Sequence, residues 1–112
     1  MKVCIIGSRS ITDFCLTPYV PNDAEMIITG GAKGVDTLAE EYADIQGFAK
    51  LIIRPEYSLY GRAAPLKRNE QMIDLSDFVL VIWDGISRGS AYAIRYAEKT
   101  GKPMRVVRVG GE

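Results

Sequence analysis

The sequence has 112 residues, of which 47% are hydrophobic and 25% are charged, a composition that is typical of a globular domain and excludes a disordered chain. Lysine plus arginine equals aspartate plus glutamate, 14 of each, so no overall basic excess points to a nucleic-acid partner. Histidine is absent, which excludes histidine-dependent nucleophilic catalysis and histidine-ligated metal sites. We expect one domain over residues 1–112, without a metal or a cofactor.

Cysteine usage and hydropathy indicate where such a protein resides. Cys4 and Cys15 lack the spacing of metal or redox motifs, and Cys4 lies inside an apolar run. No signal-peptide pattern and no apolar stretch of about 18 residues is present. We therefore expect a cytoplasmic protein that does not enter a membrane.

The first half of the chain contains two apolar runs and one amphipathic segment. Residues 3–6 and 26–29 are continuous apolar runs, typical of strands that are buried on both faces of a parallel sheet. Between them, residues 10–22 contain two prolines and predict a short helix at most. Residues 34–47 predict a helix that ends at its glycine. The apolar stripe of this helix is Val35, Leu38, Ala39, Tyr42 and Ala43.

The second half continues the alternation. Residues 51–53 predict a third strand, and residues 64–75 predict a helix with a proline in its first turn. Residues 78–83 predict a fourth buried strand, and residues 88–99 predict a helix that a glycine and a proline end. Residues 104–109 interleave two arginines with valines, which predicts a strand at the edge of the sheet.

The alternation of strand and helix along the chain predicts an α/β fold. We expect a Rossmann-like three-layer sandwich in which a five-stranded parallel sheet has the order 3-2-1-4-5 and the crossovers are right-handed. Sheets of this kind bind ligands beyond the carboxyl ends of their strands, at the point where the strand order reverses. This point lies here between the first and fourth strands.

Three glycine- and serine-rich turns follow the first, second and fourth strands, and each carries a cation. Two of them lead into helices, whose free N-terminal N–H groups and dipole favour anions. We interpret the glycines as room for a phosphate beside the backbone, although glycines that only pack a helix on the sheet would give the same pattern. The turns supply the candidate phosphate-binding residues Gly7, Ser8, Arg9, Gly30, Gly31, Lys33, Gly34, Ser87, Gly89 and Ser90.

Further candidates lie on the predicted helices. Arg68 and Asn69, near the start of residues 64–75, are placed for an exposed bidentate clamp on phosphate. Lys67 fits a solvated helix face. Asp36, in the first turn of its helix, either complements the helix dipole or accepts hydrogen bonds from a ribose.

The motifs GSR, TGGAKGVDTLAEEYA, YGRAAPLKRN and VLVIWDGISRGSAYAI together resemble the SMF/DprA–LOG (SLOG) superfamily, most closely its small YspA-like branch of bacterial and phage proteins. The resemblance covers nearly the whole chain. It implies a Rossmann-like sheet, a pocket for a nucleotide or a nucleotide-derived ligand, and a homodimer.

Two characterised groups of this superfamily suggest different functions. In the phosphoribohydrolases an arginine corresponding to Arg68 is used together with a loop glutamate, but Ala93 occupies the position of that glutamate here. Hydrolysis of an N-glycosidic bond would then need another carboxylate, such as Asp36, Glu70 or Asp84, so no catalytic residue is assigned. DprA-type proteins bind single-stranded DNA, which the neutral charge of this chain disfavours. We expect nucleotide binding, with the hydrolase and nucleic-acid functions as alternatives.

Overall fold

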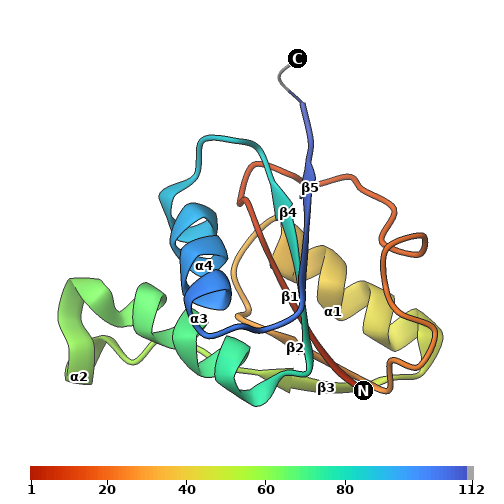
Figure 1. The fold of residues 1–112 in the computed structure, drawn as a ribbon, viewed down its shortest axis with the longest axis horizontal. Helices are drawn as coiled ribbons and strands as arrows, with labels where there is room; N and C mark the ends of the chain where they lie inside the picture. Colours follow the sequence, from red (N-terminus) through yellow and green to blue (C-terminus); the bar gives the residue numbers. More distant parts are fainter. Residues whose placement is uncertain (111–112) are drawn as a thin grey trace.

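The computed structural model describes residues 1–110, and its strands form one five-stranded parallel sheet (Figure 1). The sheet has the order β3-β2-β1-β4-β5, which confirms the predicted α/β fold and strand order. Its strands are β1 (Lys2–Gly7), β2 (Met26–Thr29), β3 (Ala49–Ile52), β4 (Phe78–Trp83) and β5 (Met104–Arg108). The helices are α1 (Val35–Gln46), α2 (Tyr57–Tyr60), a 3₁₀ turn (Gly61–Ala63), α3 (Ala64–Leu75) and α4 (Arg88–Lys99).

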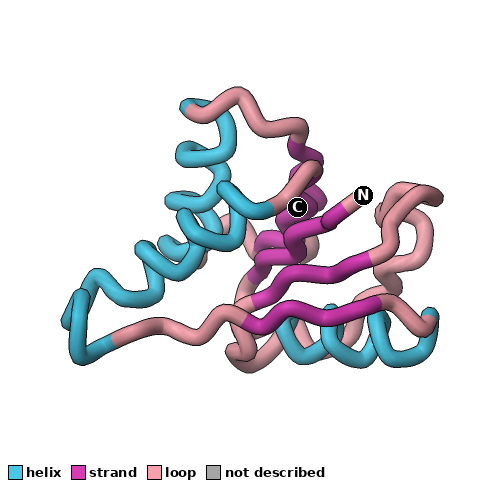
Figure 2. Tube along the Cα trace, turned by 90° about the horizontal axis from the view of Figure 1, so that it is seen from below, coloured by secondary structure: helices cyan, strands magenta, loops and turns pink. Residues whose placement is uncertain are grey.

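The helices cover the sheet on both faces, with α1 on one side and α3 and α4 on the other (Figures 1 and 2). Side chains of β1 alternate between the two layers: Val3 and Ile5 pack toward α1, whereas Cys4 and Ile6 pack toward α3 and α4. All four are at most 4% exposed. Successive side chains of a strand point to opposite faces, so a strand covered on both faces needs a continuous apolar run.

The connection between β1 and β2 departs from the predicted alternation of strand and helix. Residues 8–25 form turns and contain no helix, which breaks the strict alternation and agrees with the expectation of a short helix at most over residues 10–22. Prolines 18 and 21 donate no backbone hydrogen bond and fix their own φ, which prevents a regular helix. The layer is completed instead by the buried side chains of Ile11, Leu16, Val20 and Ala24, which pack in the same cluster as α1.

The two outer strands are less buried than the inner ones. Most of β5 is exposed, as predicted for an edge strand, and β3 forms the opposite edge. Strand β3 begins at Ala49, two residues before the predicted run, because Ala49 and Lys50 pair with Met26 and Ile27 of β2. Backbone pairing therefore extends a strand beyond its apolar residues.

The segment after β3 leaves the sheet and carries the short helix α2, which stands away from the body of the molecule before the chain enters α3 (Figures 1 and 2). Tyr57 and Leu59 of α2 are exposed. No helix within residues 1–110 combines the length and the apolar character needed to cross a membrane.

Gly34, which precedes α1, is expected to be essential for folding. Its φ is 74° and its ψ is −125°, and a Cβ there would lie 2.5 Å from the carbonyl oxygens of Ser8 and Arg9. Gly34→Ala should lower the free energy of unfolding by about 3 kcal/mol or more, through backbone strain and overpacking. The measurement is urea denaturation at equilibrium.

Gly47, at the other end of α1, is the matched control. Its φ is also 74°, but its ψ is 23° and a Cβ there would meet no atom within 4 Å. Gly47→Ala should cost only about 1 kcal/mol, the strain of a left-handed residue. Equal losses for the two variants would contradict the close approach of α1 to the turn after β1.

Candidate functional site

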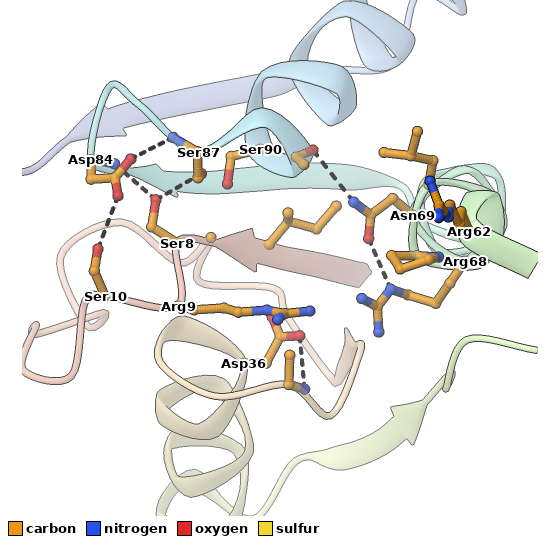
Figure 3. A pocket seen from close by; sticks show the side chains of 16 residues that line it. Ser8, Arg9, Ser10, Asp36, Arg62, Arg68, Asn69, Asp84, Ser87 and Ser90 are labelled. Atoms are coloured by element: carbon orange, nitrogen blue, oxygen red, sulfur yellow. Dashed lines mark hydrogen bonds between the residues drawn. The ribbon is translucent and has the colours of Figure 1, made fainter. Parts of the chain in front are cut away.

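A cavity of about 490 Å³ lies at the carboxyl edge of the sheet, where the turns after β1 and β4 meet the start of α3 (Figure 3). The chain reverses its strand order between β1 and β4, so the cavity occupies the place that ligands take in open α/β sheets. Its volume is within the usual range for small-molecule sites. It is lined by Ile6, Gly7, Ser8, Arg9, Ser10, Ala32, Asp36, Arg62, Pro65, Leu66, Arg68, Asn69, Asp84, Ser87, Gly89 and Ser90.

A hydrogen-bond network joins the turns after β1 and β4. The hydroxyl of Ser8 accepts the N–H of Asp84 at 2.9 Å and lies 3.0 Å from the hydroxyl of Ser87. The carboxylate of Asp84 accepts the N–H groups of Ile86 and Ser87, both at 2.8 Å, and the hydroxyl of Ser10 at 2.9 Å. These bonds stabilise the charged form and lower the pKa of Asp84 to about 2. Asp84 is therefore an anion whose bonds shape the turn.

The N-terminus of α4 opens toward the cavity. This helix has no side-chain cap, and within residues 1–110 the N–H groups of Arg88, Gly89 and Ser90 have no hydrogen-bond partner. A Cβ at Gly89 would meet no protein atom within 4 Å. Free N–H groups at a helix N-terminus attract an anion through their donors and the helix dipole. The α4 terminus is thus a place where a phosphate can approach the backbone.

The glycine turn before α1 is arranged differently. A Cβ at Gly30 would overlap the guanidinium of Arg68, so the absent side chain makes room for the protein's own arginine. The N–H of Ala32 is bonded to the carboxylate of Asp36 at 3.1 Å. For Gly30 and Gly34 the alternative reading of the pattern holds: close packing requires these glycines. The turn before α1 therefore already has an acceptor from the protein itself, the carboxylate of Asp36.

Arg68 and Asp36 are buried on either side of this turn. Arg68 is 7% exposed and donates to the carbonyl of Gly30 at 2.6 Å and to the side-chain oxygen of Asn69 at 3.0 Å. Asn69 in turn donates to the carbonyl of Gly89 at 3.4 Å, which connects α3 to α4. The expectation of an exposed arginine clamp is corrected, because Arg68 holds the turn and lines the cavity at the same time.

Burial sets the acid–base properties of this pair. It raises the pKa of Asp36, which is 6% exposed, and the N–H of Ala32 and the charge of Arg68 offset only part of that effect. Burial also lowers the pKa of Arg68, against the opposing effect of Asp36. Of the two carboxyl groups in the cavity wall, Asp36 is therefore the one whose pKa is shifted upward.

A second hollow of about 410 Å³ adjoins the cavity and contains most of the remaining predicted residues. It is lined by Arg9, Gly30, Gly31, Ala32, Lys33, Arg54, Pro55, Tyr57 and Arg68. Gly34 lines neither space. Sequence reasoning did not assign Arg54, although this residue directly follows the predicted third strand of residues 51–53, and its place at a strand end was a usable signal.

Glu70, one of the three carboxylates considered for hydrolysis, does not reach the cavity. It accepts a short hydrogen bond from the hydroxyl of Tyr92 on α4, and its other oxygen lies 3.7 Å from the ammonium group of Lys67. It lines neither hollow. Asp36 and Asp84 remain as the carboxylates of the site. Within the described residues no three acidic or cysteine side chains are grouped as metal ligands.

Comparison of the chain with family models, with curated proteins and with solved structures found no match to any of them.

Removal of the Arg68 side chain should destabilise the fold. Arg68→Ala leaves the buried carbonyl of Gly30 without its donor and Asp36 without its nearby cation, so we expect a loss of about 2 kcal/mol in the free energy of unfolding. Lys67→Ala removes a half-exposed neighbour and should cost less than about 1 kcal/mol. Chemical denaturation of both variants tests this; similar losses would mean that Arg68 is not a structural residue.

Asp84 should contribute to stability at acid pH. Its pKa is about 2 in the folded protein and about 4 in an unfolded chain, so the unfolded state takes up the proton first. The stabilisation is complete above pH 4 and is lost as the pH falls to 2. Thermal unfolding measured from pH 6 to pH 2 should show that Asp84→Asn loses less stability on acidification than the wild type does. The exposed Asp13, substituted in Asp13→Asn, is the control and should behave as the wild type.

Proposed function

We propose that this protein binds a phosphorylated nucleotide or a nucleotide-derived ligand in the cavity at the carboxyl edge of its sheet. The observation that carries the proposal is the uncapped N-terminus of α4: it has three free N–H groups, and two of the residues that carry them, Gly89 and Ser90, line a cavity of about 490 Å³. A phosphate there would receive the hydrogen bonds that the protein itself does not supply. The hydroxyl groups of Ser87 and Ser90 line the same wall.

The other walls suit the remainder of a nucleotide. Ile6, Pro65 and Leu66 offer apolar surface for a base or sugar. Arg9 and Arg62 line the cavity without an ion pair to any carboxylate of the described residues, so they are available to a phosphate. Asp84 carries the opposing charge, but its bonds direct it to the N–H groups before α4 and leave those of residues 88–90 free.

A second candidate, hydrolysis of the N-glycosidic bond of the bound nucleotide, is favoured by one observation. Asp36 is a buried carboxyl group in the cavity wall whose pKa is raised by burial, and a shifted pKa in a cavity is typical of groups that act in acid–base chemistry. The protein can be incubated with each nucleotide and the mixture analysed by chromatography. A released base would show hydrolysis, whereas an intact nucleotide would show binding alone.

Gly89→Asp should have opposite effects on folding and on binding. An acidic residue in the first turn of α4 complements the helix dipole, so the melting temperature should be kept or raised. The same carboxylate occupies the space of the phosphate and repels it, so nucleotide binding should fall by about tenfold or more. The measurement is thermal shift and calorimetric titration with nucleoside mono-, di- and triphosphates, NAD and ADP-ribose.

Gly89→Ala separates charge from bulk, because it fills the same space with an uncharged methyl group and should weaken binding less. For the wild type, a ligand at about 100 times its dissociation constant adds roughly 2.7 kcal/mol of stability, which a thermal shift detects. Binding of a nucleotide to Gly89→Asp as tightly as to the wild type would refute the placement at α4. The absence of any wild-type response to the panel would refute nucleotide binding.

A further inference from the structure

The second hollow carries a concentration of positive charge that the neutral chain as a whole does not have. Four cationic side chains line it, and no aspartate or glutamate does; the cations are Arg9, Lys33, Arg54 and Arg68. None of the four has a carboxylate oxygen within 4.0 Å among the described residues. Asp36, the nearest opposing charge to Arg68, belongs to the wall of the larger cavity instead.

Two of these arginines are held in place by consecutive carbonyl groups of one turn. Arg68 comes from α3 and donates to the carbonyl of Gly30 at 2.6 Å; Arg54 comes from the end of β3 and donates to that of Gly31 at 3.3 Å. Each bond uses one N–H of a guanidinium that has five. The remaining donors are thereby ordered before any ligand arrives, which reduces the entropy that an anion must overcome on binding.

The hollow and the larger cavity adjoin each other at the carboxyl edge of the sheet. They share three lining residues, Arg9, Ala32 and Arg68, so a single ligand can contact both. Four cations side by side repel one another, and a bound anion relieves that repulsion. Packing against the Gly30–Gly31 turn explains in part why Arg54 and Arg68 lie at this hollow. It does not explain why Arg9 and Lys33 lie there.

We infer that the ligand carries at least two phosphoryl groups, as a nucleoside diphosphate or a dinucleotide does, and that the basic hollow binds the group farther from the α4 terminus. This inference rests on the proposed function and narrows its ligand class. Arg54 is the residue through which it can be tested, because Arg54 is exposed and lines only this hollow.

The test is calorimetric titration of the wild type and of Arg54→Gln with matched nucleoside mono- and diphosphates, at one fixed salt concentration. The wild type should bind the diphosphate about tenfold more tightly than the monophosphate, the ratio that one additional charge-assisted contact gives. In Arg54→Gln that ratio should fall toward one while the monophosphate affinity is unchanged. Arg95→Gln, which removes an exposed arginine of α4 outside both hollows, should keep the wild-type ratio.

The other outcomes separate failure of this inference from failure of nucleotide binding. If the wild type binds the monophosphate and the diphosphate with equal affinity, the inference of a second phosphate subsite is overturned and the proposed function stands. Equal weakening of both by Arg54→Gln would mean that Arg54 only supports the glycine turn, and would also overturn it. No binding of either, with a single-stranded oligonucleotide bound in a strongly salt-dependent manner, would overturn both proposals in favour of a nucleic-acid backbone.

Discussion

The buried guanidinium of Arg68 connects parts of the carboxyl edge that lie far apart in the sequence. It joins the turn after β2 to α3 through the carbonyl of Gly30, and through Asn69 it reaches the first turn of α4. A buried charge is tolerated only when its donors are bonded and an opposite charge is near, and Gly30, Asn69 and Asp36 meet these conditions. The placement of the turn after β2 against α3 therefore depends on this residue.

Arg68 also divides that edge into two electrostatic regions. On the side of β1 and β4, the cavity contains Asp36 and Asp84 together with serines and the α4 terminus. On the side of β3, the hollow contains cations and glycine backbone but no carboxylate. Hydrogen bonds lower the pKa of Asp84, whereas burial raises that of Asp36, so the pKa values of the two carboxyl groups in the cavity are shifted in opposite directions.

The two glycine turns show why a motif alone does not identify a phosphate site. Both follow a strand and precede a helix, and both contain small residues. In the turn before α1, Gly30 and Gly34 accommodate Arg68 and the loop after β1, and Asp36 bonds the N–H of Ala32. In the turn before α4, the space above Gly89 is open and the N–H groups remain free. The difference comes from neighbours that are distant in the sequence.

The sequence by itself determined the α/β class, the three long helices and the two-sided burial of β1 and β4, because these follow from local hydrophobic periodicity. The strand order 3-2-1-4-5 was the preferred one among the orders that right-handed crossovers allow, and the structure confirms it. It also placed most site residues at one sheet edge, since the carboxyl ends of parallel strands meet there. It predicted a short helix at most for residues 10–22, and it did not show that the irregular backbone of this connection buries Ile11 and Leu16 in the same cluster as α1.

Only the tertiary structure decided that Arg68 is buried, that Glu70 turns to Tyr92, and that Arg54 joins the basic hollow. Each of these outcomes depends on the partner that a long side chain meets across the fold. Helical spacing places Arg68 and Glu70 on the same helix without showing what lies opposite either of them. A side chain's charge state and accessibility are set by those through-space neighbours, and no local pattern of residues contains them.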